Sequence, residues 1–171
     1  MKMWTSSVLS LLGLMLGTGL SSSQAPSFSV SPSMVAPATD GKVWGGLIYA
    51  SNGEVGGIDK KLLPSGLQDL SQRLAKVFSF AHFELLGHHN QDVFRQYESW
   101  VVPSRDLFLK VDSKGPAEGG GVNLHLQFWQ EQQVLVKTDA MLRVDSPLFI
   151  GGPKWKDGQL IFVLMLTRQE K

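Results

Sequence analysis

The side chains that could carry out chemistry are few, and the imidazoles come first among them. His82, His88, His89 and His125 are the only histidines. A metal site needs ligands that converge with defined geometry, but His88 and His89 would point to opposite faces of a strand, and the glycine and asparagine beside them indicate a turn in solvent. His82 and His125 could still meet across neighbouring strands, which the sequence leaves open. We therefore predict no metal ligands and no cofactor.

Ser104, Arg105 and Asp106 place three polar side chains together in the chain. Nucleophilic catalysis needs a hydroxyl beside a base and an orienting acid, whereas Pro103 and the apolar run that begins at Leu107 indicate a turn that leads into a strand. Arg105 and Asp106 would then form an ion pair or an Asx-type turn bond. They stay candidates for ligand binding, and the sequence predicts no catalytic residue.

Two tryptophans stand at positions that the sequence pattern does not assign to the core. Trp129 falls on the polar side of an alternating run, and Trp155 stands between two lysines beside a turn. Exposed aromatic rings can stack on sugars or fill a partner's pocket. If a helix or the linker covers that face of the sheet, both rings are instead buried beneath it. Trp129 and Trp155 are therefore candidate ligand-binding residues, with burial as the alternative.

One amphipathic helix of about 12 residues is predicted after Pro64. Ser65 and Gln68 have the spacing of a capping box, and the apolar residues that follow recur at helical spacing. The predicted buried stripe consists of Leu67, Leu70, Leu74 and Val77.

The other segments are strand-like. Residues 43–50 precede Asn52-Gly53, a hairpin signal, and residues 78–86, 93–102 and 107–111 are further candidate strands. Residues 122–129 have the clearest period of two, with 134–142 as an antiparallel partner. The continuously apolar run 160–166 predicts a central strand buried on both faces. The predicted fold class is α+β, with one amphipathic helix packed on a mainly antiparallel β-sheet or open sandwich.

The chain begins like an exported precursor. Lys2, an apolar run of about 13 residues and a small-residue end at Ala25 predict a signal peptide over 1–25, since a membrane-spanning helix needs ~20 residues. Residues 26–42 are rich in Ser, Pro and Ala and predict a disordered linker, and 43–171 would form a single domain. We expect a periplasmic or secreted protein without a transmembrane anchor after cleavage.

Composition excludes several classes of protein. The chain has no cysteine, so disulfides, thiol catalysis and thiolate zinc sites are impossible. Lys2 is the only charged residue before Ala25, so the chain after cleavage has as many acidic as basic residues. A neutral balance argues against nucleic acid as a partner.

Several segments together resemble a known family. They are Ile48–Asn52, Val77–Phe80, Trp100–Lys110, Gln127–Trp129, Leu135–Asp139 and Pro147–Pro153. With them the chain is similar to a family of uncharacterised exported proteins from environmental bacteria of the verrucomicrobial kind. Because that family has no assigned activity, the resemblance implies no catalytic or binding residue.

The sequence favours a non-catalytic structural or protein-interaction module, with another envelope protein or a glycan as its partner. One alternative is a small hydrolase or metal-dependent enzyme that uses His82, His125, Arg105 and Asp106. The other is a carbohydrate-binding module that uses Trp129 and Trp155.

Overall fold

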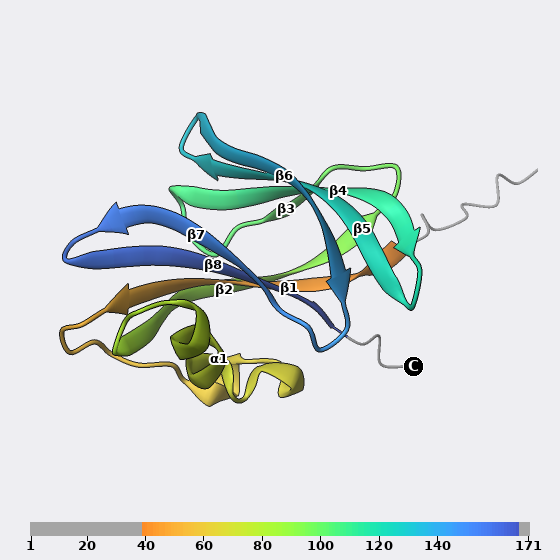
Figure 1. Cartoon of the computed structure of the whole chain (residues 1–171). Coiled ribbons are helices and arrows are strands. Elements are labelled where there is room, and N and C mark those ends of the chain that lie inside the picture. The colour runs from red at the N-terminus through yellow and green to blue at the C-terminus, as the bar shows by residue number, and fades with distance from the viewer. Residues whose placement is uncertain (1–38, 168–171) are drawn as a thin grey trace, which may run out of the picture. The chain divides into compact units, whose positions relative to one another are not determined.

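The computed structural model describes residues 39–167, so the predicted signal peptide and residues 26–38 of the predicted linker lie outside the described part. Eight strands form two four-stranded antiparallel sheets, which lie one above the other in Figure 1. Sheet A has the strand order β2-β1-β8-β7, and sheet B has the order β3-β4-β5-β6. The strands are β1 (Thr39–Ser51), β2 (His82–Phe94), β3 (Ser99–Val101), β4 (Leu107–Ala117), β5 (Gly121–Gln130), β6 (Gln133–Arg143), β7 (Leu148–Trp155) and β8 (Gly158–Thr167).

The inner faces of the two sheets form the larger hydrophobic core. Alternation in β5 shows why, because Val122, Leu124, Leu126 and Phe128 are all buried while the residues between them lie on the outer face. Phe128 meets Phe162 of β8 edge to face, with ring centroids 5.5 Å apart. The core therefore joins the two sheets through alternate side chains of each strand.

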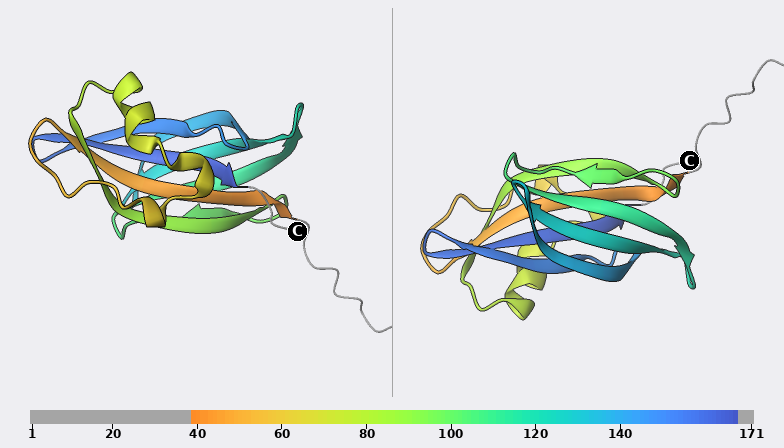
Figure 2. Two further views of the ribbon diagram at one scale, coloured as in Figure 1. Left: turned by 90° about the horizontal axis from the view of Figure 1, so that it is seen from below. Right: turned by 90° about the horizontal axis from the view of Figure 1, so that it is seen from above.

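A helical segment between β1 and β2 supplies a second hydrophobic cluster. It contains the 3-10 turns Lys60–Leu62 and Ser65–Leu67 and the helix α1 (Leu70–Val77). Leu67, Leu70 and Leu74 are fully buried, in one cluster with side chains of sheet A such as Trp44 and Ile161. Figure 2 shows α1 lying across sheet A on the side away from sheet B.

Strand β8 is consequently buried on both faces. Leu160, Phe162 and Leu164 belong to the core between the sheets, and Ile161 and Val163 belong to the cluster with the helical segment. This alternation explains the continuous apolar run, and it confirms the prediction of a central strand. The described residues likewise confirm a mainly antiparallel β-structure that contains one α-helix.

Two glycines interrupt the apolar pattern of β1 because large side chains approach it from both sides. A Cβ on Gly45 would lie 2.2 Å from a methyl carbon of Val101 in sheet B. A Cβ on Gly46 would lie 2.3 Å from the ring of Trp44, which leans across it. Glycine at both positions lets the opposite sheet and the indole ring close onto the strand.

The start of the predicted helix and the predicted burial of its last residue were wrong, although α1 ends at Val77 as predicted. The residues from Ser65 to Leu67 form a 3-10 turn, and no side chain caps it, so the capping box does not exist. Gln68 instead donates its amide N–H groups towards the carbonyls of Lys60, Leu63 and Pro64. Val77 is 60 % exposed rather than buried, because α1 ends there.

Two predicted turns were also wrong. Asn52-Gly53 opens a long connection rather than a tight hairpin, and Asn52 accepts a hydrogen bond from the Ala81 amide. His88 and His89 lie within β2, not in a turn. Gly151–Pro153 forms an irregularity inside β7, where the register to β8 shifts between Gly151 and Lys154. The first strand begins at Thr39, earlier than the predicted start of order at Val43.

Within residues 39–167, no helix is long and apolar enough to cross a membrane.

Candidate interaction surface

Three aromatic side chains gather on the outer face of sheet B, and we call them the aromatic cluster. Trp100 comes from β3, Phe108 from β4 and Trp129 from β5, three strands that are neighbours in the sheet. Phe108 and Trp129 stand directly opposite each other in the β4–β5 ladder. The cluster is therefore held on a regular sheet and not on a loop.

The rings of the aromatic cluster contact one another. Phe108 and Trp129 are nearly parallel, with centroids 6.2 Å apart and 11° between their planes. Trp100 is tilted against both, at 5.6 Å from Phe108 and 6.3 Å from Trp129. Mutual packing of this kind restricts the rings before any partner binds.

Strand alternation and a hairpin explain why these residues meet. Phe108 alternates with the buried Leu107 and Leu109, so it faces outwards, and Trp129 does the same next to the buried Phe128 of β5. The hairpin between β4 and β5 turns through Gly119 and Gly120, both with positive φ, and its pairing sets Phe108 opposite Trp129. The sequence analysis predicted only Trp129 of this cluster. Phe108 has the same pattern, because it is an aromatic residue at an outward-facing position of an alternating run.

The aromatic cluster is only partly exposed. Trp100 is 36 % exposed, and Phe108 and Trp129 are half-buried. The indole nitrogen of Trp129 is buried and has no hydrogen-bond partner in the described part of the chain. Trp129 can therefore offer ring carbons to a ligand, but not its N–H group.

A charged group borders the aromatic cluster. Lys110, opposite Trp100 in the ladder, has its ammonium 2.5 Å from a Glu98 carboxylate oxygen and 3.4 Å from one of Asp112. The hydrogen bond to Glu98, together with the charges of both carboxylates, raises the pKa of Lys110 despite its partial burial. Lys110 is thus a fixed cation at the border of the cluster.

Trp155 lies elsewhere, at the end of β7 in sheet A. Its ring meets Tyr49 edge to face at 4.9 Å, and the Lys156 ammonium lies over the ring at 4.2 Å. Tyr49 in turn donates a hydrogen bond to Asp157, which raises the pKa of the tyrosine and lowers that of the carboxyl. Trp155 and Trp129 do not form one surface, since each has different ring partners on a different sheet.

Arg105 and Asp106 lie in the connection before β4, and both are exposed. The hydroxyl of Ser104 accepts hydrogen bonds from the amides of Asp106 at 3.3 Å and Leu107 at 3.0 Å, which closes the turn. The side chains of Arg105 and Asp106 have no ion pair or hydrogen bond with any other described residue. The predicted ion pair or Asx-type bond was therefore wrong, and serine makes the turn.

The structure does not bring the candidate catalytic residues together. His82 begins β2 in sheet A, and His125 lies in β5 of sheet B, where its Nδ1 is 2.7 Å from an Asp139 oxygen. Asp106 precedes Leu107, which pairs with Gln130, five residues along β5 from His125. That length of strand is about 17 Å, whereas proton transfer needs contact at ~3 Å.

The remaining histidines have structural contacts. The His88 ring stacks on Trp44 with centroids 6.2 Å apart. His89 accepts a hydrogen bond at Nδ1 from the Val102 amide, at 3.2 Å, which links β2 to the connection after β3. No group of three or more His, Asp or Glu side chains within residues 39–167 is arranged to hold a metal ion.

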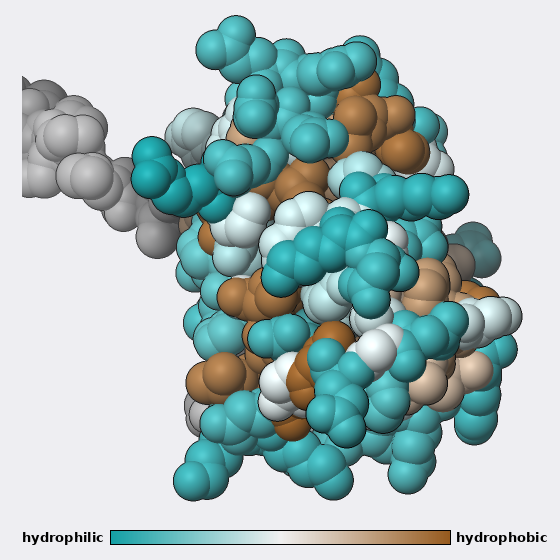
Figure 3. Space-filling model, turned by 90° about the vertical axis from the view of Figure 1, so that its left-hand side faces the viewer, coloured by the Kyte–Doolittle hydropathy of each residue, from teal (hydrophilic) through white to brown (hydrophobic). Residues whose placement is uncertain are grey.

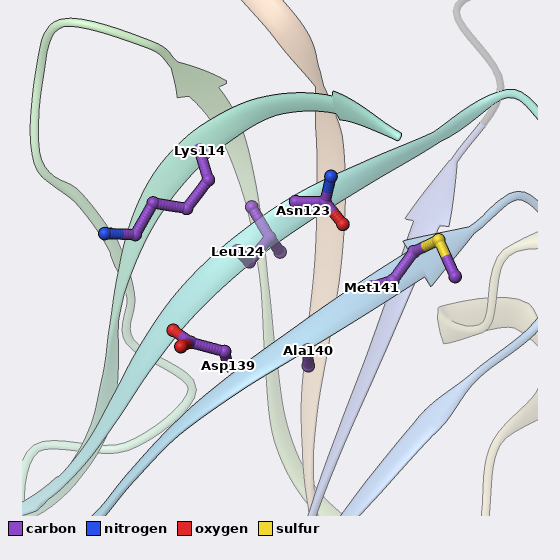
Figure 4. Close-up of a pocket in the computed structure, with 6 residues that line it drawn as sticks. All are labelled: Lys114, Asn123, Leu124, Asp139, Ala140 and Met141. Atoms are coloured by element: carbon purple, nitrogen blue, oxygen red, sulfur yellow. The ribbon is translucent and has the colours of Figure 1, made fainter. Parts of the chain in front are cut away.

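A shallow, open hollow lies on sheet B towards the other end of β5. Figure 4 shows that the labelled polar side chains spread apart across three strands and do not converge on one point. Small-molecule sites are usually enclosed and have convergent polar groups, so the hollow carries no argument for a ligand. Its lining consists of Lys114, Asn123, Leu124, Asp139, Ala140 and Met141.

No protein-family model, curated protein or solved structure matches the chain.

Proposed function

We propose that the protein is an exported, non-catalytic interaction module that binds a partner protein through the aromatic cluster on sheet B. The observation that carries the proposal is the position of Trp100, Phe108 and Trp129 on an outer sheet face. No helix or strand of the described residues covers that face, whereas the helical segment covers sheet A (Figures 1 and 2). An aromatic cluster without a covering layer is typical of a binding surface.

Burial and charge support a protein partner. Tryptophan is enriched among the residues that dominate binding energy at protein interfaces, usually in a patch with a polar border. The aromatic cluster has that composition, with Lys110, Glu98 and Asp112 on one side of it. At the end of the molecule that Figure 3 shows, hydrophobic residues form separate patches between hydrophilic ones.

A glycan is the second candidate ligand, and one observation favours it. Gln127 is the neighbour of Lys110 across the β4–β5 ladder, so an amide and an ammonium group lie two residues along the strands from the stacked Phe108 and Trp129 rings. Ring carbons that stack and amide groups that donate suit the faces and hydroxyls of a sugar. In this case the platform would be the aromatic cluster and not the pair Trp129 and Trp155.

Export and the family resemblance are parts of the same proposal. The signal-peptide pattern supports export, and a mature chain that begins near Pro26, detected by mass spectrometry in the periplasmic fraction or the medium, would establish it. A full-length chain with Met1 in the cytoplasm would contradict it.

Affinity capture from envelope extracts tests the binding surface. Trp100→Ala should remove the captured partner, because it deletes the most exposed ring of the cluster. Trp155→Ala is a matched control, since Trp155 is 37 % exposed and lies on sheet A. A glycan array probed with the same proteins separates the two candidate ligands.

The outcomes are distinct. A protein retained by the wild type and by Trp155→Ala, but lost with Trp100→Ala, supports the proposal. A glycan signal with the same dependence on Trp100 selects the second candidate. Partner binding that is lost with Trp155→Ala and kept with Trp100→Ala, or specific turnover of a small molecule, would overturn it.

A further inference from the structure

Strand β6 is a long edge strand with apolar side chains in solvent. It spans Gln133–Arg143 and pairs with β5 on one side only. Leu135, Val136 and Met141 are 37, 38 and 43 % exposed. An edge strand of this length presents unpaired backbone N–H and C=O groups that another strand can meet.

The exposed part of β6 is open on both faces of the sheet. Val136 stands opposite Phe128, whose side chain is buried in the core between the sheets, yet Val136 itself is exposed. Lys137 and Asp139 stand opposite Gln127 and His125 on the outer face, and both are exposed as well. Neither sheet A nor the helical segment therefore covers this stretch of strand.

We infer that β6 pairs antiparallel with β6 of a second copy, around a two-fold axis that passes through Thr138. Pairing of this kind joins two copies of sheet B into one continuous sheet. Lys137 then lies opposite Asp139 of the second copy, and Asp139 lies opposite its Lys137. Val136 lies opposite Ala140 on the inner face, so the strand is charge-complementary to itself.

The registers next to this one are less favourable. A two-fold axis at Lys137 would set two lysines directly opposite each other, and an axis at Asp139 would do the same with two aspartates, which is destabilising. A shift by one residue would turn the inner face of one strand towards the outer face of the other. The β5–β6 register is regular from Val136 to Arg143, so nothing interrupts the pairs next to Thr138.

Charge reversal tests both the contact and its register. In sedimentation velocity over a concentration series, the wild-type chain should dimerise, and Lys137→Glu or Asp139→Lys should each weaken dimerisation at least about tenfold, because like charges then face each other twice. A mixture of the two single variants should regain dimers, since an acidic side chain of one variant then faces a basic side chain of the other at both positions. Lys154→Glu makes the same charge change on β7, at an edge of sheet A, and should have no effect.

A cross-link gives a second readout that does not depend on affinity. Directly opposite residues in an antiparallel ladder have Cα atoms about 4.5–5.5 Å apart, which lies within the range for a disulfide. The chain has no cysteine, so Thr138→Cys would introduce the only thiol. Oxidation should convert this variant to a covalent dimer and should leave Lys154→Cys a monomer.

A wild-type chain that stays monomeric up to about 100 µM, or a dimer that ignores the charge reversals and gives no Thr138→Cys cross-link, would overturn the inference. Thermal unfolding of each variant checks that it is folded. The aromatic cluster plays no part in these measurements, so their outcome is independent of the proposed partner binding.

Discussion

The carboxylate of Asp40 links the two sheets through a hydrogen bond from Ser113, and it also pairs with Arg95, which directly follows β2. The Asp40 side chain is only 7 % exposed, and it accepts hydrogen bonds from Arg95 at 2.6 and 3.3 Å and from the Ser113 hydroxyl at 2.6 Å. Asp40 lies in β1 of sheet A, and Ser113 lies in β4 of sheet B. The Arg95 hydrogen bond and the Ser113 hydroxyl hold the pKa of Asp40 below its usual value, although partial burial opposes them.

Asp40→Asn should lower the free energy of unfolding by about 1.5–3 kcal/mol at neutral pH, the usual range for hydrogen bonds to a charged group. The pKa of Asp40 is lower in the folded than in the unfolded state, so its contribution is present above the unfolded value of about 3.9 and is lost as the pH falls through the folded value. Urea titrations of both proteins between neutral and acidic pH measure this, and their stabilities should converge at the acidic end.

Asp92→Asn is the matched control for this prediction. Asp92 pairs with Lys42 at 3.9 Å, and both side chains are about half-exposed, so the substitution should hardly change the stability. Equal effects of the two substitutions, or a difference for Asp40→Asn that does not shrink in acid, would show that the ionised Asp40 carboxylate does not stabilise the fold.

At the level of elements, buried leucines hold the helical segment on sheet A, and Ser65 contributes no cap. Leu70→Ala or Leu74→Ala should each lower the free energy of unfolding by roughly 2–5 kcal/mol, because both side chains are fully buried in the cluster with sheet A. Chemical denaturation midpoints measure the loss. The changes should leave partner binding intact, since the aromatic cluster lies on the other sheet.

Three substitutions are controls for the helical segment. Gln72→Ala and Val77→Ala should stay within about 0.5 kcal/mol, because both side chains are exposed. Ser65→Ala should also have little effect, since the Ser65 side chain caps no helix. If Gln72→Ala were as harmful as Leu74→Ala, the helix would be buried on its other face.

Elements with a strong local pattern could be predicted from the sequence. The alternation of 122–129 became β5, and the continuous apolar run 160–166 became the buried part of β8, because side-chain burial follows strand geometry directly. Gly151–Pro153 has the composition of a turn but lies within β7. The pairing between β7 and β8 continues on both sides of these residues. No pattern in the local sequence indicates this tertiary contact.

The aromatic cluster could be predicted only in part, because its formation depends on tertiary contacts as well. Alternation alone put Trp129 on an outer face, but the contact with Trp100 and Phe108 depends on the order of β3, β4 and β5 in the sheet. The sequence does not give strand order. The lysines beside Trp155 in the sequence also suggested an exposed ring for ligand binding. In the structure this ring packs on Tyr49, with the Lys156 ammonium over it.

At the scale of the whole molecule, the two sheets differ in what covers them. Within residues 39–167, sheet A has apolar clusters on both faces, whereas the outer face of sheet B has the aromatic cluster and charged side chains. A two-fold axis through Thr138 would stand perpendicular to sheet B, so both copies would present their aromatic clusters on the same side. A dimer could therefore bind a surface of repeated partners with two sites at once.

The most direct test of the aromatic cluster as the binding surface is fluorine NMR of protein labelled with 5-fluorotryptophan. Trp44 reports on the buried helix side of sheet A, Trp100 and Trp129 on the aromatic cluster, and Trp155 on the β7–β8 turn, and each signal can be assigned by a Trp→Phe variant. The labelled protein is titrated with the envelope fraction that the wild type retains. The account predicts that the signals of Trp100 and Trp129 shift while those of Trp44 and Trp155 stay in place. A shift confined to Trp155, or binding that moves none of these four signals, would contradict it.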